Sequence, residues 1–317
     1  MSGILPQPTG PDAPSPADPV ASLDRTGEYL GPAGAAAVAA AGRATPTRWR
    51  LLLRKTTFFV GAGIVLFWVV CAVFEYQIAP YNPLAQQLLD ANAAPSALHW
   101  FGTDPLGRDV LSRVITGARD ILIITPLATI LGTIVGTALG LAMGYIGGSL
   151  DLVAGRIVEA LLALPVVIVA FLFIVALGAS TVTLIVVVGL VFAPLIARTV
   201  RAAVLVERHQ DYVSASRLLG EGPARVMFAE ILPNVMPAIL VEFTVRLGYA
   251  VFALATLSFL GFGIPPPTPD WGADIAANYI NLTAGYWWQT LFPALAIASL
   301  VTAVILIADS IEQVLAA

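Results

Sequence analysis

The 317-residue chain is 58% hydrophobic and only 11% charged, with a formal net charge of −4. A water-soluble domain carries roughly 25% charged residues because its surface must be wet, so this composition excludes a wholly soluble protein. The small net charge also gives no reason to expect nucleic acid as a partner.

The side chains that most often carry chemistry are scarce. Cys71 is the only cysteine, so an intrachain disulfide is impossible, and the two histidines, His99 and His209, lie far apart in the sequence. We therefore expect no metal site and no catalytic residue in this chain.

The first 47 residues are rich in Pro, Ala, Gly, Ser and Asp and have no periodic apolar face. Such a segment cannot bury enough apolar surface to offset the entropy lost on ordering. We expect residues 1–47 to form a disordered cytoplasmic tail.

Six later segments are long and apolar enough to cross a bilayer, for which a helix needs about 20 residues. They predict an all-α integral membrane protein with six transmembrane helices. The segments are Thr57–Ile78, Asp120–Tyr145, Leu152–Leu177, Thr181–Val204, Val235–Phe262 and Thr290–Ala308.

The segment between the first two spans contains two candidate ion pairs. Asp104 precedes Arg108 by four residues and Asp109 precedes Arg113 by four, which is the spacing of facing neighbours on a helix. An aspartate followed by proline, as at Asp104, is a good helix start. Together with an apolar side made by Leu106, Val110, Leu111 and Val114, this pattern predicts an amphipathic helix on the outer surface.

Glycines recur every four residues through the second span and just beyond it. Small residues at this spacing let another helix approach closely. The glycines are Gly132, Gly136, Gly140, Gly144 and Gly148.

The longest internal connection, Val206–Pro233, reads VERHQDYVSASRLLGEGPARVMFAEILP. Gly220 and Gly222 break a short helix, and Pro223 can open a second one. We expect the apolar side of this helix–turn–helix elbow to consist of Val213, Leu218, Leu219, Val226, Met227 and Ile231. An ordered amphipathic elbow favours a docking surface for a soluble partner over a solvated loop.

The fifth span carries Glu242 and Arg246, four residues apart and nearer its cytoplasmic end. Charges inside a span are costly and either pair or face a wet cavity. A static ion pair near the headgroups and a cavity-facing pair both fit the sequence.

Lysine and arginine gather on one side of the six-span arrangement. The connection between residues 263 and 289 contains no lysine or arginine, only Asp270 and Asp274. Because basic residues favour the cytoplasmic side, we expect both termini and the elbow to be cytoplasmic. The basic residues on that side are Arg48, Arg50, Arg54, Lys55, Arg201, Arg208, Arg217 and Arg225.

The elbow resembles the coupling loop of ABC importer permeases, whose pattern is Glu-Ala-Ala, three residues, Gly, and later Ile-x-Pro. The matching residues are Ala215, Gly220, Ile231 and Pro233, and the lead-in Asp211 and Tyr212 is similar to that of peptide importers. The family's glutamate is replaced by Ser214, which puts a charge contact from that position to the ATPase in doubt. Arg217, in the first arm, can donate several hydrogen bonds to a partner.

Two further stretches sharpen the resemblance. They are WFGTDPLGRDVLSRVITGAR, residues 100–119, and LSFLGFGIPPPTPDWGADI, residues 257–275, which includes Asp270 and Trp271 in the expected external loop. Both are similar to segments of the C-type permease of the dipeptide/oligopeptide/nickel family. The resemblance covers residues 48–317 and implies one permease domain with the type I ABC importer fold.

That resemblance implies a function as well as a fold. The chain would form half of a translocation pathway and couple ATPase motion to alternating access, in a bacterial inner membrane. It implies three kinds of partner: a second, B-type permease, two ABC ATPases and an extracytoplasmic substrate-binding protein. We expect no cofactor on this chain and ATP with Mg on the ATPases, because a P-loop ends in Gly-Lys and the only lysine is Lys55, in LLLRKTT.

Other interpretations were weighed on the same residues. An ion-coupled secondary transporter normally has acidic residues at mid-membrane and an internal repeat, and neither is clear here. An intramembrane protease needs a nucleophile with a base, and neither histidine lies in a predicted span. Within the ABC importer interpretation, di- or oligopeptides, nickel chelates and other small solutes all remain open as substrates.

Overall fold

The computed structural model describes residues 55–315, so the predicted tail at residues 1–47 lies outside the described part. Helices account for nearly all regular structure in this part, with one isolated β-bridge between Thr103 and Asp109. The elements are α3 (Thr56–Val73), α4 (Glu75–Ile78), η1 (Leu88–Asp90), α5 (Val110–Ile146), α6 (Gly148–Leu162), α7 (Val166–Leu177), α8 (Thr181–Glu207), α9 (Asp211–Leu218), α10 (Pro223–Arg225), η2 (Val226–Ile231), α11 (Leu232–Phe259), α12 (Trp271–Asn278), η3 (Tyr279–Ala284) and α13 (Trp288–Leu315).

Five helices, or six spans if a bent pair is counted as one, are long and apolar enough to cross a membrane. The predicted membrane architecture is therefore confirmed. The bent pair is α6 and α7, which meet at 92° where a single third span was predicted. Pro165 precedes α7 and has no backbone N–H to donate, so a helical hydrogen bond is lost at this point and the chain bends here.

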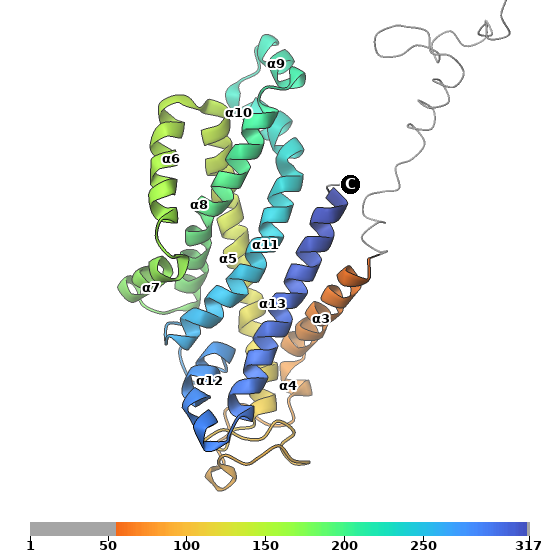
Figure 1. Ribbon diagram of the computed structural model, residues 1–317, viewed down its shortest axis with the longest axis vertical. Coiled ribbons are helices and arrows are strands. Elements are labelled where there is room, and N and C mark those ends of the chain that lie inside the picture. The colour runs from red at the N-terminus through yellow and green to blue at the C-terminus, as the bar shows by residue number, and fades with distance from the viewer. Residues whose placement is uncertain (1–54, 316–317) are drawn as a thin grey trace, which may run out of the picture. The chain divides into compact units, whose positions relative to one another are not determined.

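Helices α5 and α8 form the centre of the bundle (Figure 1). The glycine row of α5 explains their close approach. A Cβ at Gly132 or Gly136 would lie 2.6 or 2.7 Å from a backbone oxygen of α8, closer than carbon can approach. Gly140 and Gly144 face α8 in the same way, whereas Gly148 lies past the end of α5 in open space. Four of the five predicted glycines therefore serve helix packing.

The other long helices surround this pair. Helix α13 packs between α3 and α11, and α11 also contacts α5 and α8. The short helix α12 packs against α11 and α13 at the end of the bundle opposite α9 (Figure 1).

The predicted surface helix beginning at Asp104 is wrong. Asp104 instead closes a tight turn, accepting hydrogen bonds from the amides of Leu106 and Arg108, and Gly107 has φ +69°. The helix begins at Val110, with Asp109 accepting from the amide of Ser112 at 2.8 Å. It then continues as α5 for 37 residues, ten residues earlier than the predicted second span.

Candidate functional site

The elbow, residues 206–233, contains two short helical arms joined by a tight turn. Helix α9 ends at Leu218, and Gly220 follows with φ +78°, a conformation that favours glycine. Pro223 then occupies the first turn of α10, which continues through η2 into α11. The predicted helix–turn–helix is present with these boundaries.

The apolar side of the elbow is smaller than the sequence predicted. Val213, Val226 and Ile231 are fully buried and join the two arms. Leu218 and Leu219, expected on the same side, are instead 90% and 81% exposed. The turn at Gly220 directs them outward, so the elbow presents two bare leucines at its tip.

Most residues singled out in the elbow are open to solvent. The exposed ones are Asp211, Ser214, Ala215, Arg217, Gly220 and Pro233, while Ile231 is buried and supports the fold of the elbow. Tyr212 is half-buried, and its hydroxyl donates to a carboxylate oxygen of Glu207 at 2.7 Å. Burial, together with this hydrogen bond to Glu207, raises the pKa of Tyr212 to about 12, so it stays a neutral donor.

The carboxyl end of α8 is fastened to the turn between α5 and α6. Arg201 makes a bidentate ion pair with Asp151, at 2.5 and 2.7 Å, in the first turn of α6. Arg208 donates to the carbonyl oxygen of Gly144 at 2.9 Å. The two arginines therefore hold the last turn of α5 and the first turn of α6.

A third arginine reaches the same turn from the elbow itself. The guanidinium carbon of Arg217 lies 4.8 Å from the ring centroid of Tyr145, in cation–π geometry. Beyond Tyr145, Gly147 and Gly148 have φ +69° and +60° and make a sharp break between the two helices. The arginine-held turn, residues 144–151, is thus in direct contact with the elbow.

Our interpretation of the sequence did not identify Tyr145 or Asp151. The adjacent glycines at 147 and 148, followed by an aspartate in the next helical turn, were the only local signal. Asp151 pairs with Arg201, 50 positions later, and Tyr145 contacts Arg217, 72 positions later. Partners this far apart cannot be recognised from residue spacing along one helix.

At the other end of the molecule, a second cluster joins α5 to α12. Arg113 binds the Asp274 carboxylate through Nη2 at 2.5 Å and through Nε at 3.0 and 3.1 Å. The predicted Asp109–Arg113 pair is therefore wrong, since Asp109 caps α5 and contacts His99 Nδ1 at 2.9 Å. The predicted Asp104–Arg108 pair is present at 2.5 Å, but in a turn.

Asp270 and Trp271 also belong to this second cluster. Asp270 caps α12 by accepting from the amide of Ala273, and it accepts from the Ser258 hydroxyl at 2.8 Å. Burial raises the pKa of the Asp270 carboxyl, although these hydrogen bonds oppose the shift. Trp271 is fully buried and donates from Nε1 to the carbonyl oxygen of Val114 at 2.8 Å.

Inside α11, Glu242 and Arg246 lie as their spacing suggested. Arg246 Nε and Nη2 each approach Glu242 Oε1 at 2.6 Å, and the guanidinium also lies 5.5 Å from the ring centroid of Tyr249. Glu242 is 9% exposed, so the two charges satisfy each other largely away from solvent.

Across residues 55–315, no three His, Cys, Asp or Glu side chains gather as they would to hold a metal ion. Lys55 lies at the start of α3, where its amine donates to Gln313 Oε1.

Comparisons with known proteins agree with this geometry. The family described as "binding-protein-dependent transport system inner membrane component" matches residues 136–317. The N-terminal TM domain of oligopeptide transport permease C matches residues 47–95.

Individual relatives cover most of the chain. The dipeptide transport system permease protein DppC of Escherichia coli (strain K12) is 40% identical over 274 residues, covering 84% of this chain and 91% of its own. The protein of the same name from Bacillus subtilis (strain 168) is 36% identical over 271 residues, covering 86% and 85%. The glutathione transport system permease protein GsiD of Escherichia coli O1:K1 / APEC is 36% identical over 270 residues, covering 84% and 88%.

One solved structure shares the fold. A chain from the inward-facing MetNI methionine ABC transporter superposes with a TM-score of 0.52 at 22% identity, covering 64% of this chain and 96% of that chain. At this identity the likeness describes the fold alone.

Proposed function

This chain belongs to the binding-protein-dependent transport system inner membrane components and is a multi-pass permease subunit of an ABC importer. From that premise we propose that its substrates are short peptides and that its elbow couples ATPase motion to transport. The family is one of transport permeases rather than catalytic enzymes, and membership implies work with another permease, ATPases and a binding protein.

The substrate proposal is supported by the named relatives. Two of them are named as dipeptide transport permeases and one as a glutathione transport permease. Glutathione is itself a small peptide. Uptake into vesicles containing the complex and its binding protein tests the proposal, with a labelled dipeptide and a labelled nickel chelate supplied separately. Uptake of the chelate without uptake of the dipeptide would contradict the peptide proposal and identify nickel chelates as the substrate.

The proposed division of labour assigns no nucleotide site to this chain. ATP and Mg belong to two partner ATPases, and this chain pairs with a B-type permease to form half of the pathway. The elbow and both termini lie in the cytoplasm and the α12 end lies outside, which the distribution of basic residues supports.

The observation that carries the coupling proposal is the tip of the elbow. Leu218 and Leu219 are the most exposed leucines of the elbow, and neighbouring apolar side chains held out on an ordered tip favour a surface that docks a partner. Arg217 lies next to these leucines and contacts Tyr145. A displacement of the tip by a bound ATPase would therefore be transmitted directly to the arginine-held turn.

Replacing both tip leucines by serine tests docking without disturbing the fold, because neither side chain is buried. We expect Leu218→Ser/Leu219→Ser to lose ATPase subunits on size-exclusion chromatography and to lose most uptake. The matched control is Leu88→Ser/Leu89→Ser, which makes the same change at side chains 70% and 102% exposed in η1, in the predicted external segment. Retention of the ATPases by the tip variant would remove the docking role.

Transmission through the elbow has its own test. Arg217→Gln removes the contact with Tyr145, whereas Arg225→Gln removes an equal charge that pairs only with Glu221 on the elbow surface. We expect Arg217→Gln to keep its ATPases but to hydrolyse ATP with less uptake per ATP. Equal uptake per ATP in the two variants would contradict transmission through Arg217.

A further inference from the structure

Helices α6 and α7 lie along one side of α8, and two neighbouring cavities open between them. The first is polar, measures about 690 Å³ and lies between α6 and the carboxyl half of α8. Its charged lining residues are Asp151, Arg156, Glu159, Arg198 and Arg201.

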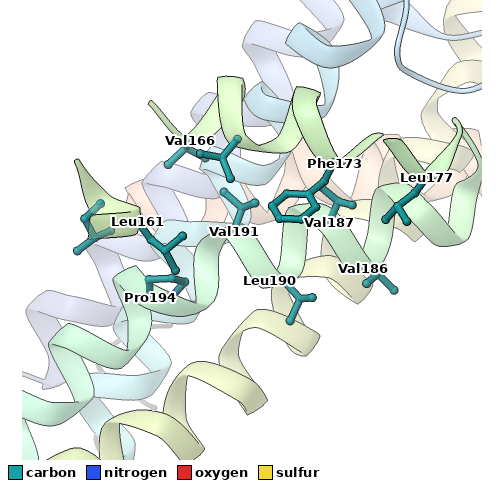
Figure 2. A pocket seen from close by; sticks show the side chains of 11 residues that line it. Leu161, Val166, Phe173, Leu177, Val186, Val187, Leu190, Val191 and Pro194 are labelled. Atoms are coloured by element: carbon teal, nitrogen blue, oxygen red, sulfur yellow. The ribbon is translucent and has the colours of Figure 1, made fainter. Parts of the chain in front are cut away.

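The second cavity is lined by apolar side chains and measures about 310 Å³. Figure 2 shows Val166 and Phe173 of α7 facing Val187 and Val191 of α8 across it. Leu162 lines both cavities, so they are adjoining parts of one groove.

The polar cavity holds one unbalanced positive charge. Arg201 is neutralised by Asp151 and Arg156 by Glu159. Arg198 lines the cavity and has no carboxylate within ion-pair distance among residues 55–315. An arginine on an apolar membrane helix is costly unless it pairs with an anion or faces water. The Arg198 side chain is exposed to the cavity, and its planar fork suits a phosphate.

The apolar cavity begins one helical turn away from that charge. Pro194 lines the apolar part and Arg198 the polar part, and four residues along a helix bring side chains onto the same face. A free anion would fill only the charged part, and an apolar helix from another subunit would leave Arg198 unpaired. An amphiphile with an anionic head and a hydrocarbon tail satisfies both.

We propose that this groove binds an anionic phospholipid, with its headgroup phosphate on Arg198 and an acyl chain between α7 and α8. The assignment to the cytoplasmic leaflet rests on the orientation proposed above, in which the carboxyl end of α8 is cytoplasmic. Basic pockets between membrane helices on that side are suited to such headgroups.

Lipid binding is measured on the complete, delipidated complex in detergent by titration with fluorescent phosphatidylglycerol, using phosphatidylcholine as the uncharged comparison. We expect Arg198→Gln to weaken phosphatidylglycerol binding about fivefold, the usual contribution of one arginine near an anionic lipid. Leu190→Trp, which fills the apolar cavity from an exposed position, is expected to weaken binding of both lipids.

The matched control is Lys55→Gln. It removes one positive charge at the start of α3, on the side of the bundle away from α6 (Figure 1). It is expected to leave phosphatidylglycerol binding unchanged. Inorganic phosphate at millimolar concentration is expected not to displace the lipid, whereas full displacement would identify a free-anion site and overturn the proposal.

Two other outcomes overturn it. One is equal phosphatidylglycerol affinity in Arg198→Gln and Lys55→Gln. The other is loss of the second permease from the Arg198→Gln complex on size-exclusion chromatography, because the groove would then be an interface between permeases. None of these measurements uses substrate or ATP, so a failed transport proposal would leave the result intact.

Discussion

Two arginines of α5 pair with carboxylates that lie far away along the chain, which hydropathy alone does not reveal. Arg113 in α5 pairs with Asp274, 161 positions later, and Arg119 pairs with Glu75, 44 positions earlier. A charge left alone among apolar helices costs several kcal/mol, so these long-range pairs let α5 continue through a polar stretch. The predicted second span began only at Asp120 because partners this far away along the chain are not visible in the sequence.

Short-range pairing was predictable only in part. The spacing of four residues identified Glu242–Arg246 and Asp104–Arg108, which both form. It failed at Asp109, whose carboxylate accepts from the amide and the hydroxyl of Ser112 and contacts His99. Helix capping and a distant histidine outcompeted the local arginine.

A double-mutant cycle measures the Glu242–Arg246 pair. We expect Glu242→Gln or Arg246→Met alone to cost about 3 kcal/mol of unfolding free energy, because each leaves a largely buried charge unpaired. The double variant should cost less than the sum of the two. Thermal unfolding of the assembled complex, followed by size-exclusion chromatography, reports the order of the variants.

The comparison pair for this cycle is Glu221–Arg225, which has the same spacing but an arginine side chain 71% exposed. Its coupling should stay below about 1 kcal/mol, as for other solvent-exposed pairs. Strict additivity at Glu242 and Arg246 would show that their close approach contributes nothing to stability.

Among the helices, the contact of α5 with α8 was the most predictable from sequence and the bend between α6 and α7 the least. A four-residue glycine repeat has one common structural meaning, and four of its members serve it. Pro165 indicated an irregularity in the third span. A proline inside a span is also compatible with a mild kink, and Pro126 and Pro194 do lie within continuous helices. Which outcome occurs depends on the packing of the neighbouring helices.

A single methyl group tests the α5–α8 contact. Gly136→Ala places a Cβ 2.7 Å from both the Ala193 carbonyl oxygen and the Ile196 Cβ, so the helices must separate. We expect a loss of about 1–3 kcal/mol in unfolding free energy, typical of overpacking. The midpoint of thermal unfolding of the purified complex gives the measurement.

Gly63→Ala is the matched control, because nothing lies within 4 Å of the added Cβ on α3. Alanine is the better helix former, so this variant should be unchanged or slightly more stable. The two substitutions are thus expected to have opposite signs, and a stabilising Gly136→Ala would refute the close contact.

For the whole molecule, the order of the helices was predictable from the sequence. Which ends of the helices face the cytoplasm stays a prediction. Composition alone sufficed to indicate the spans, since apolar runs of this length have few alternatives in water. The elbow's shape followed from Gly220 and Pro223. Its outward leucines did not, because the direction of Leu218 and Leu219 depends on how the turn at Gly220 is closed.

Cysteine labelling decides the orientation. Ala284→Cys in η3 and Gly222→Cys in the elbow both place a thiol at an exposed position, while native Cys71 is buried. We expect an impermeant thiol reagent applied to intact cells to label the first and not the second. After permeabilisation both should react, and labelling of Gly222→Cys in intact cells would invert the proposed topology.

Helix α5 is continuous over its whole length and can act as a rigid rod between the two ends of the bundle. Its 37 residues correspond to a rod of about 55 Å, held at one end by Asp274 and Trp271 and in contact at the other with Arg217 and Arg208. A tilt of about 5° about one end would displace the other by about 5 Å, which follows from that length alone. The predicted arrangement, a separate surface helix followed by a span beginning at Asp120, would have absorbed such a tilt, whereas a continuous helix transmits it from one face of the membrane to the other.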